Sequence, residues 1–332
     1  MPDTSKDRVV RELAGGGMGR IYEGVVVGQA GFQRPIVIKQ LRHADDAGHV
    51  SLFVEEARRY ALLDHENIGR IFDFEEVDGQ LCIILEYIDG WSLVEYLERH
   101  RQIGRLPDVE LSVFIASRVC RALQYVFERA AIVHRDVSPG NIMMTREGTV
   151  KIIDFGIATK AGTRDSSLTG KPAYMAPETI VDLRADDRSD LFSLGAVLYE
   201  TLTLRRLFPG REVGKVLEQV ITARVPSPLD VNPQVPDGVL SILQTALQRD
   251  PALRYGSAAE MGAACEHFLY DKGYGPTNLA LKDYLAGLFP DTVGAPGLPG
   301  DATVVEPTLA PITDSTGDRT PVSSEDGRRR SQ

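Results

Sequence analysis

The chain has 332 residues, of which 43% are hydrophobic and 25% charged, and its formal net charge is −10. That composition is typical of a globular protein, and an acidic chain without a basic stripe argues against nucleic acid as a main partner. No apolar run approaches the length that crosses a bilayer, and the polar N-terminus lacks the apolar segment of a signal peptide.

The first part of the chain predicts a β-sheet with one helix. β-branched runs, broken by glycines or by a hairpin turn at 77–79, predict strands at 9–10, 21–27, 36–41, 68–76 and 80–87. Only residues 49–63 carry apolar side chains at helical spacing in this part. We therefore expect a strand-rich first lobe over residues 1–88.

From about Trp91 onward the apolar pattern becomes helical. Amphipathic spacing predicts helices at 92–101, 108–130, 187–204, 211–223, 237–248 and 257–270. Residues 290–332 are rich in proline, threonine, glycine and aspartate, so we expect a disordered tail there. The expected fold is α+β and bilobal, with a mostly helical second lobe over residues 89–289.

The spacing of the three cysteines indicates the cellular compartment in which the protein works. Cys82, Cys120 and Cys265 are far apart in the sequence and lack CxxC spacing. A zinc site or a disulfide framework usually shows paired spacing, so reduced thiols in the cytoplasm are the expectation.

Two short polar motifs carry most of the chemical information. Residues 134–141 read HRDVSPGN, and residues 154–156 read DFG. The apolar runs around them predict strand, loop, strand, turn and strand. That layout would bring one carboxylate to a reacting hydroxyl and leave an amide and a second carboxylate for Mg²⁺. The alternative is an Asx-rich loop that caps itself, but it does not account for the second motif.

A glycine-rich turn and a lysine form a second candidate site. Residues 13–22 read LAGGGMGRIY between two expected strands, and glycines let backbone N–H groups approach phosphates, although a plain hairpin has the same pattern. Lys39 ends the following strand on an apolar face with Val37 and Leu41. Its ammonium group either reaches water or needs a buried partner.

Glu56 is the expected partner of Lys39. Leu52, Tyr60 and Leu63 stand at i−4, i+4 and i+7 from Glu56, which places this glutamate on the apolar stripe of the predicted helix. A lone carboxylate is costly there, and an ion pair with Lys39 would offset that cost. The alternative is an ordinary surface charge.

Taken in order, these motifs resemble the eukaryotic-like Ser/Thr protein kinase family, and in places its bacterial members. The resemblance runs from about Leu13 to Phe268 and so covers most of the chain. It implies the two-lobed kinase fold, with ATP and Mg²⁺, or Mn²⁺, as cofactors, and with Ser/Thr residues of proteins as phosphate acceptors. It also implies that two copies meet transiently when the kinase phosphorylates itself.

The resemblance assigns roles to residues of both lobes. Asp136 would be the catalytic base, and Asn141 and Asp154 would hold the metal. Lys39, paired with Glu56, would hold the α- and β-phosphates of ATP. Nucleotide contacts would come from Leu13, Ala14, Gly15, Gly16, Gly17, Met18, Gly19, Ile21, Val37, Lys39, Glu86, Ile88 and Met143.

Two of these positions depart from the family pattern. Ala14 stands where the first glycine of the loop is usual, which would stiffen the loop. Val37 stands where alanine is usual, which would narrow the adenine slot.

The segment from Asp154 to Glu178 resembles the activation segment of the family and ends in AYMAPE. By that resemblance Glu178 pairs with Arg254, and Asp190 accepts backbone N–H groups of the catalytic loop. Arg135 is the expected partner of a phosphate on this segment. The candidate phosphorylation sites are Thr163, Ser166, Ser167 and Thr169.

Two further departures concern the site of phosphate transfer. Ser138 occupies the place of the usual lysine, and Lys171 occupies the place of the usual threonine. We hypothesise that Lys171 reaches into the cleft and supplies the missing positive charge near the γ-phosphate, with Ser138 as its hydroxyl partner. The alternative is a surface lysine beside a damaged site.

Three functions fit the resemblance to different degrees. The leading one is a Ser/Thr protein kinase, because Pro139 fits that pattern better than the loop of tyrosine kinases. A pseudokinase that signals as an ATP-binding scaffold is the alternative, favoured by Ala14, Val37 and Ser138 and opposed by the retained acidic and basic residues of the site. A small-molecule phosphotransferase ranks last, because it would have no reason to carry the APE segment and Arg254.

Overall fold

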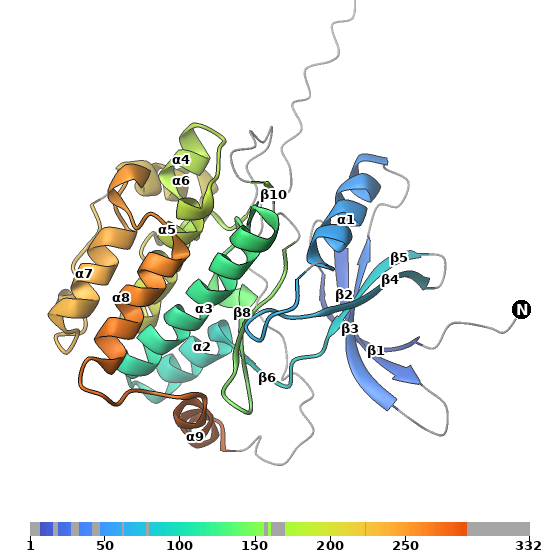
Figure 1. Ribbon diagram of the computed structural model, residues 1–332, viewed down its shortest axis with the longest axis horizontal. Coiled ribbons are helices and arrows are strands. Elements are labelled where there is room, and N and C mark those ends of the chain that lie inside the picture. The colour runs from blue at the N-terminus through green and yellow to red at the C-terminus, as the bar shows by residue number, and fades with distance from the viewer. Residues whose placement is uncertain are drawn as a thin grey trace, which may run out of the picture.

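The structure is a computed structural model that describes residues 7–15, 19–27, 33–41, 47–61, 63–77, 80–155, 159–160, 170–222 and 224–290. Two lobes stand side by side, a sheet with one helix and a larger helical lobe (Figure 1). The expected α+β, bilobal fold is therefore confirmed. The predicted tail, from residue 291 on, lies outside the described residues.

The small lobe is a five-stranded antiparallel sheet in the order β1-β2-β3-β5-β4. Its strands are β1 (Asp7–Gly15), β2 (Gly19–Val27), β3 (Gln33–Leu41), β4 (Ile71–Val77) and β5 (Gln80–Glu86). Helix α1 (Ala47–Tyr60) packs on one face of the sheet, where Phe53 and Ala57 join Leu41 and Ile83 in a small core. In the β3 register, Lys39 lies opposite Ile21 on one side and Ile83 on the other.

The predicted strand over 68–76 begins later than expected, at Ile71. Ile68 instead forms an isolated bridge with Ile152 of the large lobe, and Gly69 donates its N–H to the carbonyl of Ile152 at 3.0 Å. The apolar pattern could not reveal this, because a strand residue that pairs with the other lobe has the same side-chain preferences as one inside the sheet.

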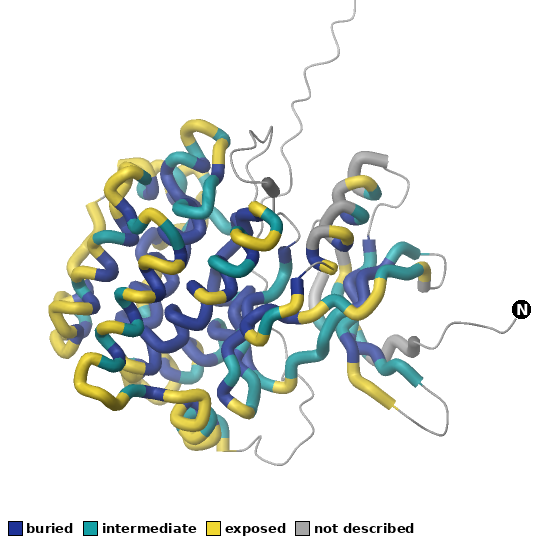
Figure 2. The backbone as a smooth tube through the Cα atoms, viewed as in Figure 1, coloured by how far each residue is buried: buried dark blue, intermediate teal, exposed yellow. Residues whose placement is uncertain are grey.

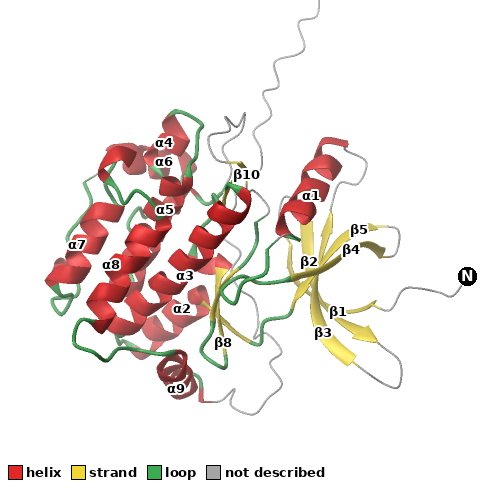
Figure 3. Cartoon of the chain, in the orientation of Figure 1, coloured by secondary structure: helices red, strands yellow, loops and turns green. Residues whose placement is uncertain are grey.

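The large lobe is mostly helical (Figure 3). Its helices are α2 (Leu93–Ile103), α3 (Val109–Ala130), α4 (Pro177–Val181), α5 (Asp187–Thr203), α6 (Val213–Thr222), α7 (Asp237–Ala246), α8 (Ala258–Tyr270) and α9 (Asn278–Leu288). Every residue from Ser189 to Thr203 in α5 is buried. Figure 2 shows buried backbone in the middle of this lobe and exposed backbone on its outer helices.

Short strands position the catalytic motifs. They are β6 (Gly90–Ser92), β7 (Ile132–Val133), β8 (Ile142–Thr145), β9 (Val150–Ile152) and β10 (Thr159–Lys160). Strands β6, β8 and β9 form one sheet, and β7 pairs with β10. The HRDVSPGN loop therefore joins β7 to β8, and the DFG residues follow β9, in the predicted order of strand, loop, strand, turn and strand.

Helix α9 is an element that our reading of the sequence did not anticipate. Leu281, Leu285 and Leu288 on this helix are buried, and Thr277 caps its N-terminus. The ring of Phe289, just after the helix, stacks on Trp91 with centroids 4.6 Å apart. No helix within the described ranges is long and apolar enough to cross a membrane.

A chain of contacts links α9 to the connection between the lobes. The guanidinium of Arg146 lies 4.9 Å from the centre of the Trp91 ring. Its Nε also donates to the carboxylate of Asp89 at 2.7 Å, and its backbone N–H donates to the Asp89 carbonyl at 2.9 Å. The end of the connecting segment is thus held by the β8–β9 turn and by a ring that follows α9.

We predict that Phe289→Ala lowers the free energy of unfolding by about 2 kcal/mol, because the variant loses a stacked aromatic pair and part of its buried area. Urea unfolding measures this change. Leu279→Ala is the matched control, since Leu279 lies on α9 itself and is 63% exposed. An equal loss in both variants would contradict the assignment of the stabilisation to the ring stack.

Candidate active site

The catalytic loop is anchored by a buried carboxylate. Asp190, on α5, accepts the backbone N–H of His134 at 2.7 Å through one oxygen and that of Arg135 at 2.8 Å through the other. Burial raises the pKa of Asp190 to about 7, and the two backbone hydrogen bonds oppose that rise. Arg135 has a φ of 69°, a backbone conformation rare outside glycine. The predicted role of Asp190 as an acceptor for this loop is confirmed.

A row of three contacting aromatic rings connects the small lobe to this loop. The ring of Phe155 meets Tyr60 of α1 edge-on at 4.8 Å and lies 4.5 Å from the ring of His134. His134 is fully buried, and a nitrogen of its ring lies 3.1 Å from the carbonyl of Ile153. Burial lowers the pKa of His134, so the neutral imidazole is favoured and the residue is suited to packing.

Asp136 lies at the centre of a hydrogen-bond cluster. Its carboxylate oxygen Oδ2 accepts from the amide of Asn141 and from Lys171 Nζ, each at 2.8 Å. Its other oxygen accepts the backbone N–H of Lys171 at 3.1 Å. Lys171 Nζ also donates to the hydroxyl of Ser138 at 3.1 Å. The predicted contact between Lys171 and Ser138 is therefore present, and the bonds from Lys171 to the candidate base are a contact that the sequence did not predict.

Asp154 forms the second charged pair of the site. Its Oδ1 accepts from Lys39 Nζ at 2.7 Å, and its φ is 63°. Burial by itself would raise the pKa of Asp154, but the ammonium of Lys39 outweighs it and the pKa falls to about 2. The side chain remains 39% exposed, so an ionised carboxylate is open to a cation from solution.

Several predicted contacts lie outside the described residues. Glu56 belongs to α1, but its side chain is among those not described, so the pair with Lys39 stays a prediction. The same holds for the predicted phosphorylation sites, which lie within residues 161–169. In the glycine-rich loop, residues 16–18 are not described, while Ala14, Gly15 and Gly19 end the strands on either side.

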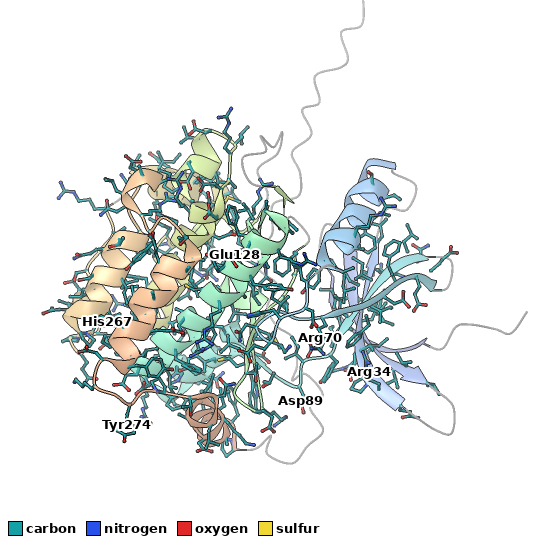
Figure 4. The ribbon with its side chains drawn as sticks, viewed as in Figure 1. Arg34, Arg70, Asp89, Glu128, His267 and Tyr274 are labelled. Carbon is teal, nitrogen blue, oxygen red and sulfur yellow. The ribbon has the colours of Figure 1, made fainter. Side chains whose placement is uncertain are left out.

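The segment that connects the lobes is held by an ion pair that sequence reasoning missed. Lys151, buried on β9, donates to the carboxylate of Glu86 at 3.1 Å and to the carbonyl of Ile68 at 3.2 Å. A lysine inside the apolar run before DFG was the available signal. Arg70 and Asp89 mark this connection in Figure 4.

The structure reduces the number of backbone groups in this segment that could bind adenine. The backbone N–H of Glu86 donates to the carbonyl of Arg70 at 2.8 Å. That N–H is therefore already engaged within the protein. The backbone of Ile88 and the carbonyl of Glu86 stay the candidates for adenine.

The end of the activation segment is firmly attached. Two nitrogens of Arg254 donate to the two oxygens of Glu178, each at 2.7 Å, and Ser189 donates to the same carboxylate at 2.7 Å. The Arg254 side chain is fully buried. Nearer to Lys171, the hydroxyl of Tyr174 donates to buried Glu200 at 2.6 Å. The predicted pair of Glu178 and Arg254 is confirmed.

The donor set suits a nucleotide that carries a divalent cation. Such a cation prefers oxygen ligands, and the carboxylate of Asp154 and the amide of Asn141 supply oxygens within one short stretch of the large lobe. Lys39 supplies a positive charge for phosphate from the small lobe. The two-lobed fold and these charged and amide side chains together fit the class of domains that bind a nucleotide with a divalent cation.

Comparison with known proteins agrees with this class. The protein kinase domain model matches residues 8–268, and the chain belongs to the protein kinase family. It is 34% identical over 264 residues to the serine/threonine-protein kinase PrkC of Bacillus subtilis, covering 77% of this chain and 39% of that protein. It is 35% identical over 277 residues to the probable serine/threonine-protein kinase SCO3848 of Streptomyces coelicolor, covering 80% and 40%.

A third relative differs in its name and in the extent of the match. The tyrosine-protein kinase MasK of Myxococcus xanthus is 34% identical over 327 residues, which cover 93% of this chain and 49% of that protein. This alignment is longer than the other two, and the kinase domain model itself ends before α9. The chain spans less than half the length of each of these three relatives.

We predict that Arg254→Met destabilises the fold by about 3–5 kcal/mol, because it leaves the carboxylate of Glu178 without its charged partner in a largely buried place. Chemical denaturation measures the loss. Lys215→Met is the control, because the Lys215 pair with Glu212 is exposed on both sides. A similar, small loss in the two variants would contradict the anchoring role of the buried pair.

Proposed function

We propose that the protein transfers the γ-phosphate of Mg·ATP to serine or threonine hydroxyls of proteins, including its own activation segment. The observation that supports this most is the position of Asp136. It lies on a loop fixed by a buried carboxylate, hydrogen-bonded to Asn141, with the pair of Lys39 and Asp154 nearby in the fold. Phosphoryl transfer depends mainly on such positioning and on charge.

Each residue of the site has a distinct task in this proposal. Asp136 orients the acceptor hydroxyl and accepts its proton. Asn141 and Asp154 hold the divalent cation, which neutralises phosphate charge when the nucleotide is bound. Lys39 binds the α- and β-phosphates. Magnesium is the proposed metal, and manganese is the alternative for the same oxygen ligands.

Lys171 supplies a further cation in this proposal. Its ammonium lies between Asp136 and Ser138, where the family's lysine of the catalytic loop would act. From there it stabilises negative charge that develops on the transferred phosphoryl group. The retained Asp136, Asn141, Asp154 and Lys39, together with this replacement cation, favour an active kinase over a pseudokinase.

The acceptor class is the finer part of the proposal. The names of PrkC and SCO3848 state serine/threonine kinases, and Pro139 agrees with them. The name of MasK states a tyrosine kinase, and Lys171 lies beside the place of the acceptor. Serine and threonine are therefore the proposed acceptors, and tyrosine is the outcome that would revise them.

The partners follow from the same reaction. Protein substrates carry the acceptor hydroxyls, and a second copy of the chain serves as substrate during transient pairing. Cys82, Cys120 and Cys265 are all buried, and the compartment that we propose for the protein is a reducing one such as the cytoplasm.

We predict that Asp136→Asn reduces autophosphorylation with Mg·ATP by about a thousandfold, because the amide cannot accept the proton. Radiolabel transfer and mapping of the modified residues measure this and identify the acceptor class. Asp182→Asn is the control, an exposed aspartate at the end of α4. A wild type that binds ATP but labels neither itself nor a generic protein substrate would instead favour the pseudokinase.

We predict that Lys171→Ala lowers kcat for peptide phosphorylation by about 10²-fold, with a smaller effect on the KM for ATP, because the lost charge acts mainly in the transition state. Steady-state kinetics separate the two constants. Lys215→Ala, an exposed lysine, is the control. Unchanged turnover in Lys171→Ala would exclude the replacement cation.

A further inference from the structure

We infer that the activation segment of this kinase carries part of the positive charge that the catalytic site needs. Displacement of the segment would then also remove that charge from the site and so switch the kinase off. The inference rests on the proposed function and concerns the regulation of the same site. A lysine on the catalytic loop would stay in place when the segment moves. In this chain the corresponding cation is Lys171, which belongs to the segment itself.

The catalytic loop has no replacement for this charge. Within residues 134–141 the one lysine or arginine is Arg135, at the end anchored by Asp190. Ser138 is fully buried and offers only a hydroxyl, to which Lys171 donates. Whatever displaces Lys171 therefore removes the ammonium from Asp136 and leaves the loop without a substitute at that place.

Lys171 holds Asp136 in two ways at once. Its backbone N–H donates to one carboxylate oxygen and its side chain to the other. Movement of the segment at this residue thus disturbs the orientation of the base and the local charge together. Asp136 and Asp154 are each neutralised by a lysine, and loss of Lys171 leaves the set net negative, which opposes the approach of phosphate.

The position of Lys171 is set by the segment's own anchors. Gly170, immediately before it, has a φ of 105°, a conformation that side chains other than glycine rarely adopt. Three residues beyond it, Tyr174 is tied to Glu200 of α5. These anchors lie outside the catalytic loop, so a change in the segment can reach the cation without altering the bonds by which Asp190 holds the loop.

A double-mutant cycle tests the inference. Gly170→Ala strains the segment beside Lys171, and Lys171→Ala removes the charge. We expect Gly170→Ala alone to lower kcat about tenfold or more, and to have a clearly smaller further effect in the Lys171→Ala background, where only the backbone hydrogen bond of residue 171 to Asp136 is left to disturb. Gly273→Ala is the matched control, because Gly273 also has a positive φ, of 84°, but lies in a distant loop of the large lobe.

Equal fold losses from Gly170→Ala in both backgrounds would overturn the inference, because the segment would then act by a route other than Lys171. Circular dichroism melting checks that each variant is folded. If Gly170→Ala does not fold, Tyr174→Phe replaces it, since this change removes one hydrogen bond of the segment and keeps the ring.

Relocation of the charge provides a second, independent arm. The double variant Ser138→Lys with Lys171→Thr moves the cation to the catalytic loop, into space that Lys171 vacates. We expect this double variant to have a kcat about tenfold higher than that of Lys171→Ala. We also expect Gly170→Ala to lower kcat less in this double variant than in the wild type. A folded relocation variant that regains nothing counts against the inference. Absence of any phosphotransfer by the wild type would instead reject the proposed function itself.

Discussion

The two hydrogen bonds that the Asp190 carboxylate accepts from backbone N–H groups are the constraint on which the rest of the site depends. Asp190 lies in α5, whose residues from Ser189 onward are all buried, so the acceptor itself cannot shift without disturbing the core. It fixes the start of the catalytic loop at His134 and Arg135, and therefore the orientation of the next residue, Asp136. A buried acceptor with both oxygens engaged is a rigid reference point.

Two lysines from different parts of the chain complete the charge balance around that reference. Lys39 arrives on a strand of the small lobe and pairs with Asp154, whereas Lys171 arrives on the activation segment and pairs with Asp136. Phe155, between Tyr60 and His134, connects α1 with the loop through ring contacts. The site is thus assembled from three parts of the chain: the small lobe, the activation segment and the catalytic loop. Of these, only the catalytic loop is held by Asp190.

Much of this could be predicted from the sequence because the determining patterns are local. The motifs around Asp136 and Asp154 fix a strand and loop order, and the helical spacing of apolar residues in α3 is strong. The contact of Lys171 with Ser138 could be predicted because both positions depart from the family pattern. A lysine side chain is also long enough to reach from the segment to Ser138.

What could not be predicted depends on tertiary pairing. The sequence of β4 does not reveal that Ile68 pairs with Ile152 before the strand begins, because both environments favour the same residue. Helix α9 differs, because its local signals, the Thr277 cap and the helically spaced Leu281, Leu285 and Leu288, are present in the sequence, and only its packing against α2 depends on the fold. The Lys151 pair with Glu86 joins residues far apart in the chain, and neither residue alone indicates the other.

The stack of Phe289 on Trp91 fixes the position of the last residues of the large lobe that the structure describes. Trp91 follows Asp89, the last residue of the connection between the lobes, by two positions, and Arg146 bridges the two. Any protein, tag or fluorophore joined directly after residue 290 would therefore start beside the interlobe connection rather than on the far side of the helical lobe. A fluorophore at that junction would report on the surroundings of the segment that joins the lobes, and a bulky fusion there would crowd that segment.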